Sequence, residues 1–358
     1  MQTLLTITWD MERGLDLGFI TLRYYSLLFA AGFVLGYFIM KKMFRDAGIG
    51  LDKLDTLLTY VVIATILGAR LGHVFFYEWD YYSQHPGEIL KVWKGGLASH
   101  GAAIAIIIAI IIYSRRVLNK SSLWMLDRLV ITIALAGALI RVGNWFNSEI
   151  YGEIANSKFQ TVFLNPVRER ITEAFPFVKD VRFQKLRAEV ITDTIDYPLY
   201  NLQFVTDLER SQAITMNNTV KTQIIPYMNG LDRSSRQVIF PEDFQVDYHI
   251  RGTPGVFFGE VYGIPRHPTQ LYEAFGYFII FLILYRIYLA KNLAQKRGFI
   301  FGLFLILVFG YRFFIEYYKE VQVTSEIGQT LNTGQQLSIP LVIAGLFFSV
   351  MALMRKEG

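Results

Sequence analysis

The sequence predicts an all-α polytopic membrane protein with seven transmembrane helices, N-out and C-in, and a small β-rich extracytoplasmic subdomain. Three observations lead to this fold class. The chain of 358 residues is 53% hydrophobic and only 18% charged. Seven apolar runs are long enough to cross a hydrocarbon layer of roughly 30 Å, and one long polar segment shows the alternating pattern of strands. Because backbone groups must be paired inside lipid, the seven runs are predicted to be helices.

Polar loops separate the seven runs. The predicted spans cover residues 21–40, 57–77, 97–114, 124–142, 270–289, 298–316 and 338–354. No cleavable signal is expected before the first span. Residues 1–18 include acidic and basic side chains and lack an apolar core.

Basic side chains concentrate in every second loop, which predicts the orientation. They follow spans one, three, five and seven and are Lys41, Lys42, Arg45, Lys53, Arg115, Arg116, Lys120, Arg286, Lys291, Lys296, Arg297, Arg355 and Lys356. By the positive-inside rule these loops are cytoplasmic, so the N-terminus lies outside. The basic cytoplasmic loops therefore explain the net charge of +5, and no nucleic-acid partner is expected.

The spans divide the chain into three parts. Residues 1–152 are predicted to hold spans one to four with a short N-terminal interfacial segment, and residues 267–358 to hold spans five to seven. Between them, residues 153–266 are predicted to form a periplasmic insertion of mixed or β structure. Alternating runs at 181–186 and 244–250 and turn residues at 229–230 and 253–255 favour strands there. Its role stays open between a lid, a docking surface and a lineage-specific insertion.

With this orientation, polar side chains within the spans gather in the outer half of the membrane. They are Tyr25, Arg70, His73, His100, Arg141, Asn144, Glu149, His267, Gln270, Glu273, Arg312 and Glu316. The inner half has few, chiefly Asp127 and Arg128. Ionisable groups at membrane depth are costly unless they are paired or functional. The sequence therefore predicts one polar site near the outer leaflet.

Two absences limit the chemistry. The chain contains no cysteine, so neither a disulfide nor a cysteine nucleophile or metal ligand is available. It also lacks the His-Glu-x-x-His run that zinc proteases use.

Several motifs together resemble the bacterial prolipoprotein diacylglyceryl transferases. Arg141-Val-Gly-Asn-Trp-Phe-Asn-Ser-Glu149 is similar to the family hallmark R-x-G-N-F-x-N-x-E. The other matching blocks follow in the family's order and are Gly68-Ala-Arg-Leu-Gly72, Gly95-Gly-Leu-Ala-Ser-His-Gly101, Arg266-His-Pro-Thr-Gln-Leu-Tyr-Glu273 and Tyr311-Arg-Phe-Phe-Ile-Glu316. Three departures stand out: Trp145 replaces the hallmark phenylalanine, Ala102 replaces the second glycine of His-Gly-Gly, and segment 153–266 is longer than usual.

The resemblance implies a transferase that moves the sn-1,2-diacylglyceryl group of phosphatidylglycerol to the lipobox cysteine thiol of a prolipoprotein. The product is a thioether, and glycerol phosphate is released. The implied partners are phosphatidylglycerol, the prolipoprotein signal peptide with its lipobox cysteine, and membrane lipids. The implied location is the bacterial cytoplasmic (inner) membrane, with the active site toward the periplasm.

The resemblance also suggests roles for individual residues. The expected catalytic residues are His100, Arg141, Glu149, Arg312, Glu316 and Tyr25. The expected phosphatidylglycerol-binding residues are Arg141, Arg312, Asn144, Asn147 and Gly152. A thiol titrates near pH 8.5 and imidazole near 6.5, so His100 is suited to act as its base. Arginine can neutralise a phosphate through two hydrogen bonds, so neither a metal nor another cofactor is expected.

Structural interpretations compete with these roles. His100 could cap span three, and Arg141 with Glu149, or Arg312 with Glu316, could be structural ion pairs. Which group takes the thiol proton stays open between His100, Glu149 and a water. A structural role is the better explanation for Arg70, His73, His267 and Glu273. Three aromatic residues could instead belong to the interfacial aromatic belt: Tyr25, Trp79 and Trp93.

Two other functions are also compatible with a polytopic membrane protein. A small transporter would need a polar path through both leaflets, whereas inner stretches such as Ile104–Ile112 and Phe281–Leu284 are uniformly apolar. A lipid-binding scaffold would bind without turnover, but it would not need a base, two arginines and two carboxylates together.

Overall fold

The computed structural model describes residues 5–155, 157, 159–192, 195–232, 235–248, 255–290, 292–320 and 329–355. Two compact units make up the chain. The first contains Met1–Leu28, Ile140–Phe275 and Tyr311–Leu337, and the second contains Phe29–Leu139, Gly276–Gly310 and Ser338–Gly358. Each unit is described separately below.

The predicted seven spans are confirmed within the described residues. Seven helices are long and apolar enough to cross a membrane. They are α1 (Tyr24–Asp46), α2 (Leu51–Phe76), α4 (Ser99–Tyr113, extended by the π-turn η3, Ser114–Leu118), α5 (Ser122–Phe146), α9 (Thr269–Ala290), α10 (Phe299–Ile315, extended by η7, Glu316–Tyr318) and α11 (Thr333–Met354). Most begin or end a few residues beyond the predicted limits, because the helices continue past the apolar runs.

Close approach between helices in the second unit depends on glycine. A Cβ added at Gly101 of α4 would lie 2.3 Å from the carbonyl oxygen of Gly68, and one added at Gly72 would lie 2.7 Å from the Cα of Gly101. Small residues let backbones pack this closely in lipid, where dispersion contacts stabilise helix pairs. Gly68, Gly72 and Gly101 thus permit close contact between helices, whereas Gly95 and Gly96 lie in a loop with φ of 87° and 68°.

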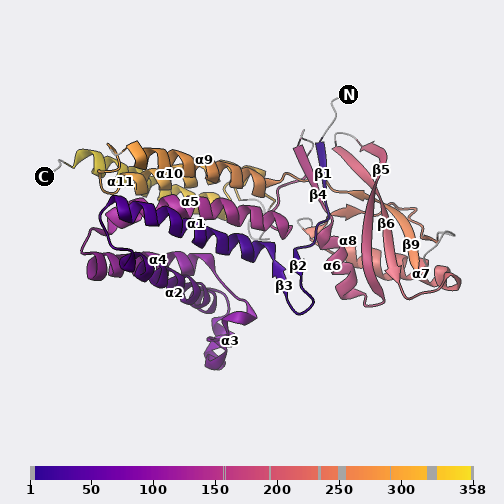
Figure 1. The fold of residues 1–358 in the computed structure, drawn as a ribbon. Coiled ribbons are helices and arrows are strands. Elements are labelled where there is room, and N and C mark those ends of the chain that lie inside the picture. Colours follow the sequence, from indigo (N-terminus) through magenta and orange to yellow (C-terminus); the bar gives the residue numbers. More distant parts are fainter. Residues whose placement is uncertain are drawn as a thin grey trace. The chain divides into compact units, whose positions relative to one another are not determined.

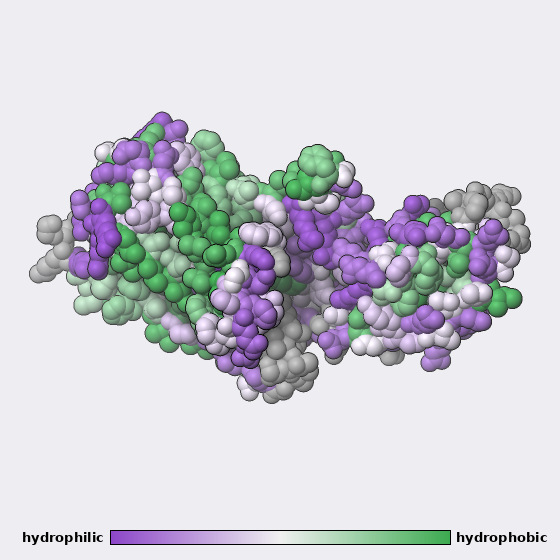
Figure 2. All heavy atoms as spheres, turned by 90° about the horizontal axis from the view of Figure 1, so that it is seen from below, coloured by the Kyte–Doolittle hydropathy of each residue, from purple (hydrophilic) through white to green (hydrophobic). Residues whose placement is uncertain are grey.

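The outer surfaces of the helices are apolar. Figure 2 shows continuous hydrophobic side chains over the helical part of the face it presents. Large examples in the second unit are Phe38, Phe75, Ile343 and Phe347, each more than half exposed. An apolar surface of this size would be unstable in water and needs a lipid environment.

The first unit contains the predicted β-rich subdomain. Its five-stranded antiparallel sheet has the order β5-β6-β9-β7, with β8 also paired to β9. The strands are β5 (Val178–Thr192), β6 (Ile195–Thr206), β7 (Val238–Ile239), β8 (Asp247–Tyr248) and β9 (Val256–Gly263). The sheet is curled into a half-barrel (Figure 1). The alternating run 181–186 forms part of β5, as expected. Only two residues of the run 244–250 form a strand, and its last two, like Thr253 and Pro254, lie outside the described residues.

Short helices complete the core of this subdomain. They are α6 (Asn165–Ala174), η4 (Arg210–Gln212), α7 (Ala213–Thr219), η5 (Val220–Ile224) and α8 (Ile225–Asn229). Val167 and Ile171 of α6 and Met216 of α7 pack with Phe204 and Phe257 of the sheet, and all five are buried. Asn229-Gly230, expected as a turn between strands, instead ends α8. The subdomain thus has a filled core.

Other small elements border the spans. The N-terminal strand β1 (Leu5–Trp9), expected as part of an interfacial segment, pairs in parallel with β4 (Phe159–Phe163). A hairpin of β2 (Gly14–Asp16) and β3 (Thr21–Arg23) leads directly into α1. In the second unit, α3 (Trp79–Gln84), η1 (Pro86–Glu88) and η2 (Val92–Lys94) connect α2 to α4.

Candidate functional site

The first unit brings together the charged ends of three helices. Arg141 lies in the last turns of α5 and Glu273 in the first turns of α9. Arg141 Nε is 3.0 Å from Glu273 Oε2, and the side chains are 14% and 0% exposed. The structure pairs Arg141 with Glu273, and the alternative of an ion pair with Glu149 stays a prediction. Such a buried pair fixes the guanidinium, because an uncompensated charge at this depth is costly.

Asn144 connects Arg141 to Glu149. Arg141 Nη1 donates to Asn144 Oδ1 at 3.2 Å, and Asn144 Nδ2 donates to Glu149 Oε1 at 2.8 Å. Asn147 Nδ2 donates to the same carboxylate oxygen at 3.2 Å. The opposite oxygen of this amide, Asn147 Oδ1, is buried without a hydrogen-bond partner among the described residues. Asn147 therefore retains an unused acceptor among the described residues.

The backbone around Glu149 adopts an uncommon conformation. Ser148 and Ile150, on either side of it, have φ of 53° and 57°. This left-handed region is unfavourable for a β-branched residue such as isoleucine. The start of α9 holds the segment in place: Gln270 Nε2 donates to the Glu149 carbonyl at 2.7 Å, and Thr269 Oγ1 donates to that of Ile150 at 3.0 Å.

Arg312 and Glu316 form the predicted i,i+4 pair at the end of α10. Arg312 Nε lies 3.3 Å from Glu316 Oε1, and Lys319 Nζ lies 2.8 Å from the same oxygen. The Arg312 side chain is 33% exposed, whereas that of Glu316 is 9% exposed. Among the described residues, Glu316 is the only acceptor that contacts the Arg312 guanidinium. The two terminal nitrogens of the Arg312 guanidinium are thus available for an anion.

Gly152 is enclosed by backbone on several sides. Its N–H donates to the His267 carbonyl at 2.9 Å, and its carbonyl accepts from Arg266 Nη1 at 3.2 Å. A Cβ here would lie 2.5 Å from the Tyr318 carbonyl oxygen and 2.6 Å from His267 Cβ. Packing explains why this position requires glycine, and the expected contact of Gly152 with phosphatidylglycerol stays a prediction.

Tyr25 begins α1 and packs against the end of α5. A Cβ added at Gly143 would lie 2.9 Å from Tyr25 Cδ2, so the aromatic ring lies directly over that glycine. Gly143 stands between Arg141 and Asn144 in the chain. The phenol therefore belongs to the same helix end as the charged cluster.

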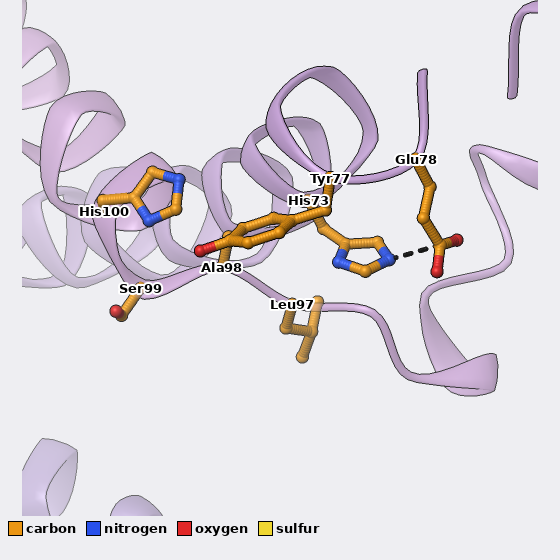
Figure 3. A pocket seen from close by; sticks show the side chains of 7 residues that line it. All are labelled: His73, Tyr77, Glu78, Leu97, Ala98, Ser99 and His100. Carbon is orange, nitrogen blue, oxygen red and sulfur yellow. Dashed lines mark ion pairs between the residues drawn. The ribbon is translucent and has the colours of Figure 1, made fainter. Parts of the chain in front are cut away.

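His100 lies in the second unit, in an open pocket of about 520 Å³ (Figure 3). The pocket is lined by His73, Tyr77, Glu78, Leu97, Ala98, Ser99 and His100. His73 Nε2 lies 3.4 Å from Glu78 Oε2. Residue Ala98 occupies the N-cap of α4 and no side chain caps it, which does not support a capping role for His100. The expectation that His100 acts together with the charged cluster stays a prediction.

Arg70 organises the loop that leads to this pocket. Its guanidinium is buried and donates to the carbonyls of Ile89, Gly95 and Glu88 at 2.8, 2.7 and 2.7 Å. It also stacks over the Tyr82 ring at 4.8 Å. These contacts agree with the structural role expected of Arg70.

Sequence reasoning missed a second buried group in the first unit. Arg266 is fully buried, and its Nη1 lies 2.7 Å from Glu320 Oε2. Arg266 also donates to the Arg236 carbonyl and to Gln237, at 2.9 and 3.2 Å. Its neighbour His267 is half-buried, and burial lowers the pKa of this imidazole, which favours the neutral form near pH 7. Arg266 begins one of the motifs that resemble the family, but its position in the sequence did not indicate that the side chain is buried.

The described residues include no group of three or more His, Asp or Glu side chains arranged to hold a metal ion. The positive charge of the cluster comes from Arg141, Arg312 and Lys319.

Comparisons with known proteins show which proteins this chain resembles. The family model described as "Prolipoprotein diacylglyceryl transferase" matches residues 14–351. A phosphatidylglycerol–prolipoprotein diacylglyceryl transferase of Tolumonas auensis is 34% identical over 349 residues, covering 97% of this chain and 98% of that protein. Proteins of the same name from Chloroherpeton thalassium and Porphyromonas gingivalis are each 32% identical, covering 97% of this chain and 94% of their own lengths.

Proposed function

The chain belongs to the prolipoprotein diacylglyceryl transferase family, and from that membership we propose how its charged cluster carries out the reaction. The protein is a membrane transferase that moves a diacylglyceryl group from phosphatidylglycerol to prolipoproteins. The proposed acceptor is the lipobox cysteine thiol beside a signal-peptide helix. Its sulfur attacks the glyceryl carbon that carries the phosphate. The carbon–oxygen bond breaks, and glycerol phosphate leaves with the electron pair.

The open guanidinium of Arg312 is the observation that carries this proposal. Negative charge grows on the phosphate as the carbon–oxygen bond breaks. A planar fork whose two terminal nitrogens contact no acceptor among the described residues can meet that charge through two parallel hydrogen bonds. Glu316 Oε1 lies 3.3 Å from Arg312 Nε. The two terminal nitrogens of the guanidinium can therefore point toward the phosphate. Arg141, already bonded to Glu273 and Asn144, supplies a fixed positive charge.

Polar groups near Arg141 fit the lipid headgroup. The unused oxygen of Asn147 can accept a hydrogen bond from a glycerol hydroxyl. Glu149 holds both asparagine amides and so fixes the direction of that acceptor. Tyr25 presents a phenol at the same helix end.

His100 is the proposed base. Its side chain is exposed in an open pocket, and an imidazole takes up protons near neutral pH. It would accept the thiol proton as the sulfur attacks. The site would face the periplasm of the bacterial inner membrane, the side on which the positive-inside rule predicts the starts of α1, α4 and α9. There both phosphatidylglycerol and the lipobox are within reach.

Incubation of the purified protein with phosphatidylglycerol and a lipobox peptide tests the proposed site. Wild type should release glycerol phosphate and form a thioether, and a Cys→Ser peptide should give neither. His100→Ala and Arg141→Ala should each lose at least about 100-fold in rate. Arg182→Ala, which removes an exposed ion pair on β5, is the control. Normal turnover by both site variants would contradict the assignments, and lipid binding without release would favour the scaffold.

Topology can be tested separately, because the chain contains no cysteine. A single cysteine at Asn119, in the loop after α4, should be protected from a membrane-impermeant maleimide in spheroplasts. One at Tyr227, in α8, should react. The reverse pattern would place the site at the cytoplasmic face.

A further inference from the structure

Two buried charges in the first unit have no role in the scheme above. Glu273 is fully buried, and the Lys319 side chain is 5% exposed. Lysine and glutamate are almost never buried to this extent unless they are paired. The desolvation they suffer also makes such a pair weak support for stability by itself. Their contacts indicate a different purpose.

The two residues lie in the middle of a row of alternating charges. Lys319 Nζ lies 3.2 Å from Glu273 Oε1 and 2.8 Å from Glu316 Oε1. Each carboxylate is shared with an arginine: Glu273 with Arg141 at 3.0 Å, and Glu316 with Arg312 at 3.3 Å. The charge ladder therefore runs Arg141, Glu273, Lys319, Glu316, Arg312. Lys319 is its centre.

The backbone fixes the central position. Lys319 pairs with Gly152 in an antiparallel bridge, and the N–H of Glu153 donates to the Tyr318 carbonyl at 2.9 Å. Gly152 is held in turn by His267, just before α9. These backbone contacts connect the segment of Lys319 with the segments around Gly152 and His267 in the first unit. A compact ammonium with three donors can serve two carboxylates at once.

We propose that Lys319 and Glu273 are positioning residues, which set the separation and orientation of Arg141 and Arg312 for diacylglyceryl transfer. This inference rests on the proposed function of the two arginines. Neither residue touches the reacting atoms. Without Lys319, each carboxylate keeps its own arginine, but the link through the ammonium between the two pairs is lost. The arginines can then move independently, and the geometry that meets the transition-state charge is lost.

Lys319→Met is the direct test. Both carboxylates keep an arginine partner, so the variant should fold with little change in its thermal midpoint. Its kcat should fall about tenfold or more, the size typical when an outer orienting partner is lost, while KM for phosphatidylglycerol changes less than threefold. Lys319→Arg should recover part of the rate. Lys42→Met, which removes an exposed pair with Asp46 at 3.0 Å, should leave kcat unchanged.

A double-mutant cycle separates positioning from general damage. If Lys319 acts through Arg312, Lys319→Met should cost much less in the Arg312→Lys background than in wild type. Additive losses, or a Lys319→Met enzyme with wild-type kcat, would overturn the inference. If Lys319→Met fails to fold, the same cycle run with Lys319→Arg decides. Wild-type turnover is measured in parallel, so failure of the ladder is distinct from failure of the proposed function.

Discussion

Asn144 binds Glu149 through its amide nitrogen at 2.8 Å and accepts from Arg141 through its oxygen at 3.2 Å. The amide is thus placed with its donor toward the carboxylate and its acceptor toward the guanidinium. This polarity excludes a carboxylate at the same position.

Asn144→Asp should therefore lower the transfer rate by about tenfold or more, because two carboxylate oxygens would then oppose each other. Asn144→Ala, which removes both hydrogen bonds without adding a charge, should lose less than Asn144→Asp. A wild-type rate for Asn144→Asp would contradict the hydrogen-bond assignment.

Arg312→Lys keeps the charge and removes the fork. The rate of glycerol phosphate release should fall about 100-fold, as when one transition-state donor is deleted, although the protein still folds and inserts. Arg182→Lys on β5, where Arg182 pairs with Asp180 at 2.8 Å, serves as the control. Equal rates for Lys and Arg at position 312 would rule out two-bond phosphate recognition there.

Gly152→Ala should destabilise the protein by roughly 1–3 kcal/mol, the usual cost of overpacking, since the new Cβ would meet backbone at 2.5 Å. Thermal unfolding in detergent measures the change. Gly310→Ala is the matched control, because nothing lies within 4 Å of the Cβ it adds. Alanine in a helix should there be neutral or slightly stabilising. Equal tolerance at both sites would contradict the packing around Gly152.

Asp10 should make stability depend on pH. Burial raises its pKa from 3.8 to about 6, against the opposing effect of Arg168, whose Nη2 lies 2.6 Å away. The folded protein then holds this proton more tightly than the unfolded chain, so the contribution of Asp10 to stability falls as pH rises from about 4 to about 6. Asp10→Asn should remove that part of the slope in thermal midpoints measured between pH 4 and 8. An unchanged slope would show that Asp10 titrates normally.

Asp127 caps a helix other than its own. Its two carboxylate oxygens accept from the N–H groups of Gly298 and Phe301 at 2.7 and 2.8 Å, at the start of α10. Asp127→Ala should cost about 2 kcal/mol, because a cap is lost and two donors are left without an acceptor. Asp55→Ala, which removes the exposed acceptor of the Tyr37 hydroxyl, should change stability by less than about 0.5 kcal/mol. Equal losses would contradict the capping role.

The sequence predicted the spans well because lipid imposes a simple requirement on them. A helix that crosses a hydrocarbon layer must be apolar for about 20 residues, and that signal is local. The Arg312–Glu316 pair was predictable for the same reason, since one helical turn joins its members. The curled sheet was predictable only as a tendency to form strands.

The partner of Arg141 was not predictable in this way. Glu273 is distant from Arg141 in sequence, yet the structure pairs the two. Tertiary packing, which no local pattern reports, brings them together. The left-handed Ser148 and Ile150 also escaped prediction, because neither is a residue type that favours this conformation.

The way α9 holds the segment around Glu149 has a consequence for biogenesis. A ribosome delivers α5 before Thr269 and Gln270 exist, so the two side chains that hold the Ser148–Ile150 turn arrive only after the intervening subdomain has been synthesised. Until then the turn has no reason to keep its costly dihedral angles. A nascent chain halted before α9 would be inserted in the membrane but would have no transferase activity. Supplying the missing C-terminal part as a separate polypeptide should restore that activity.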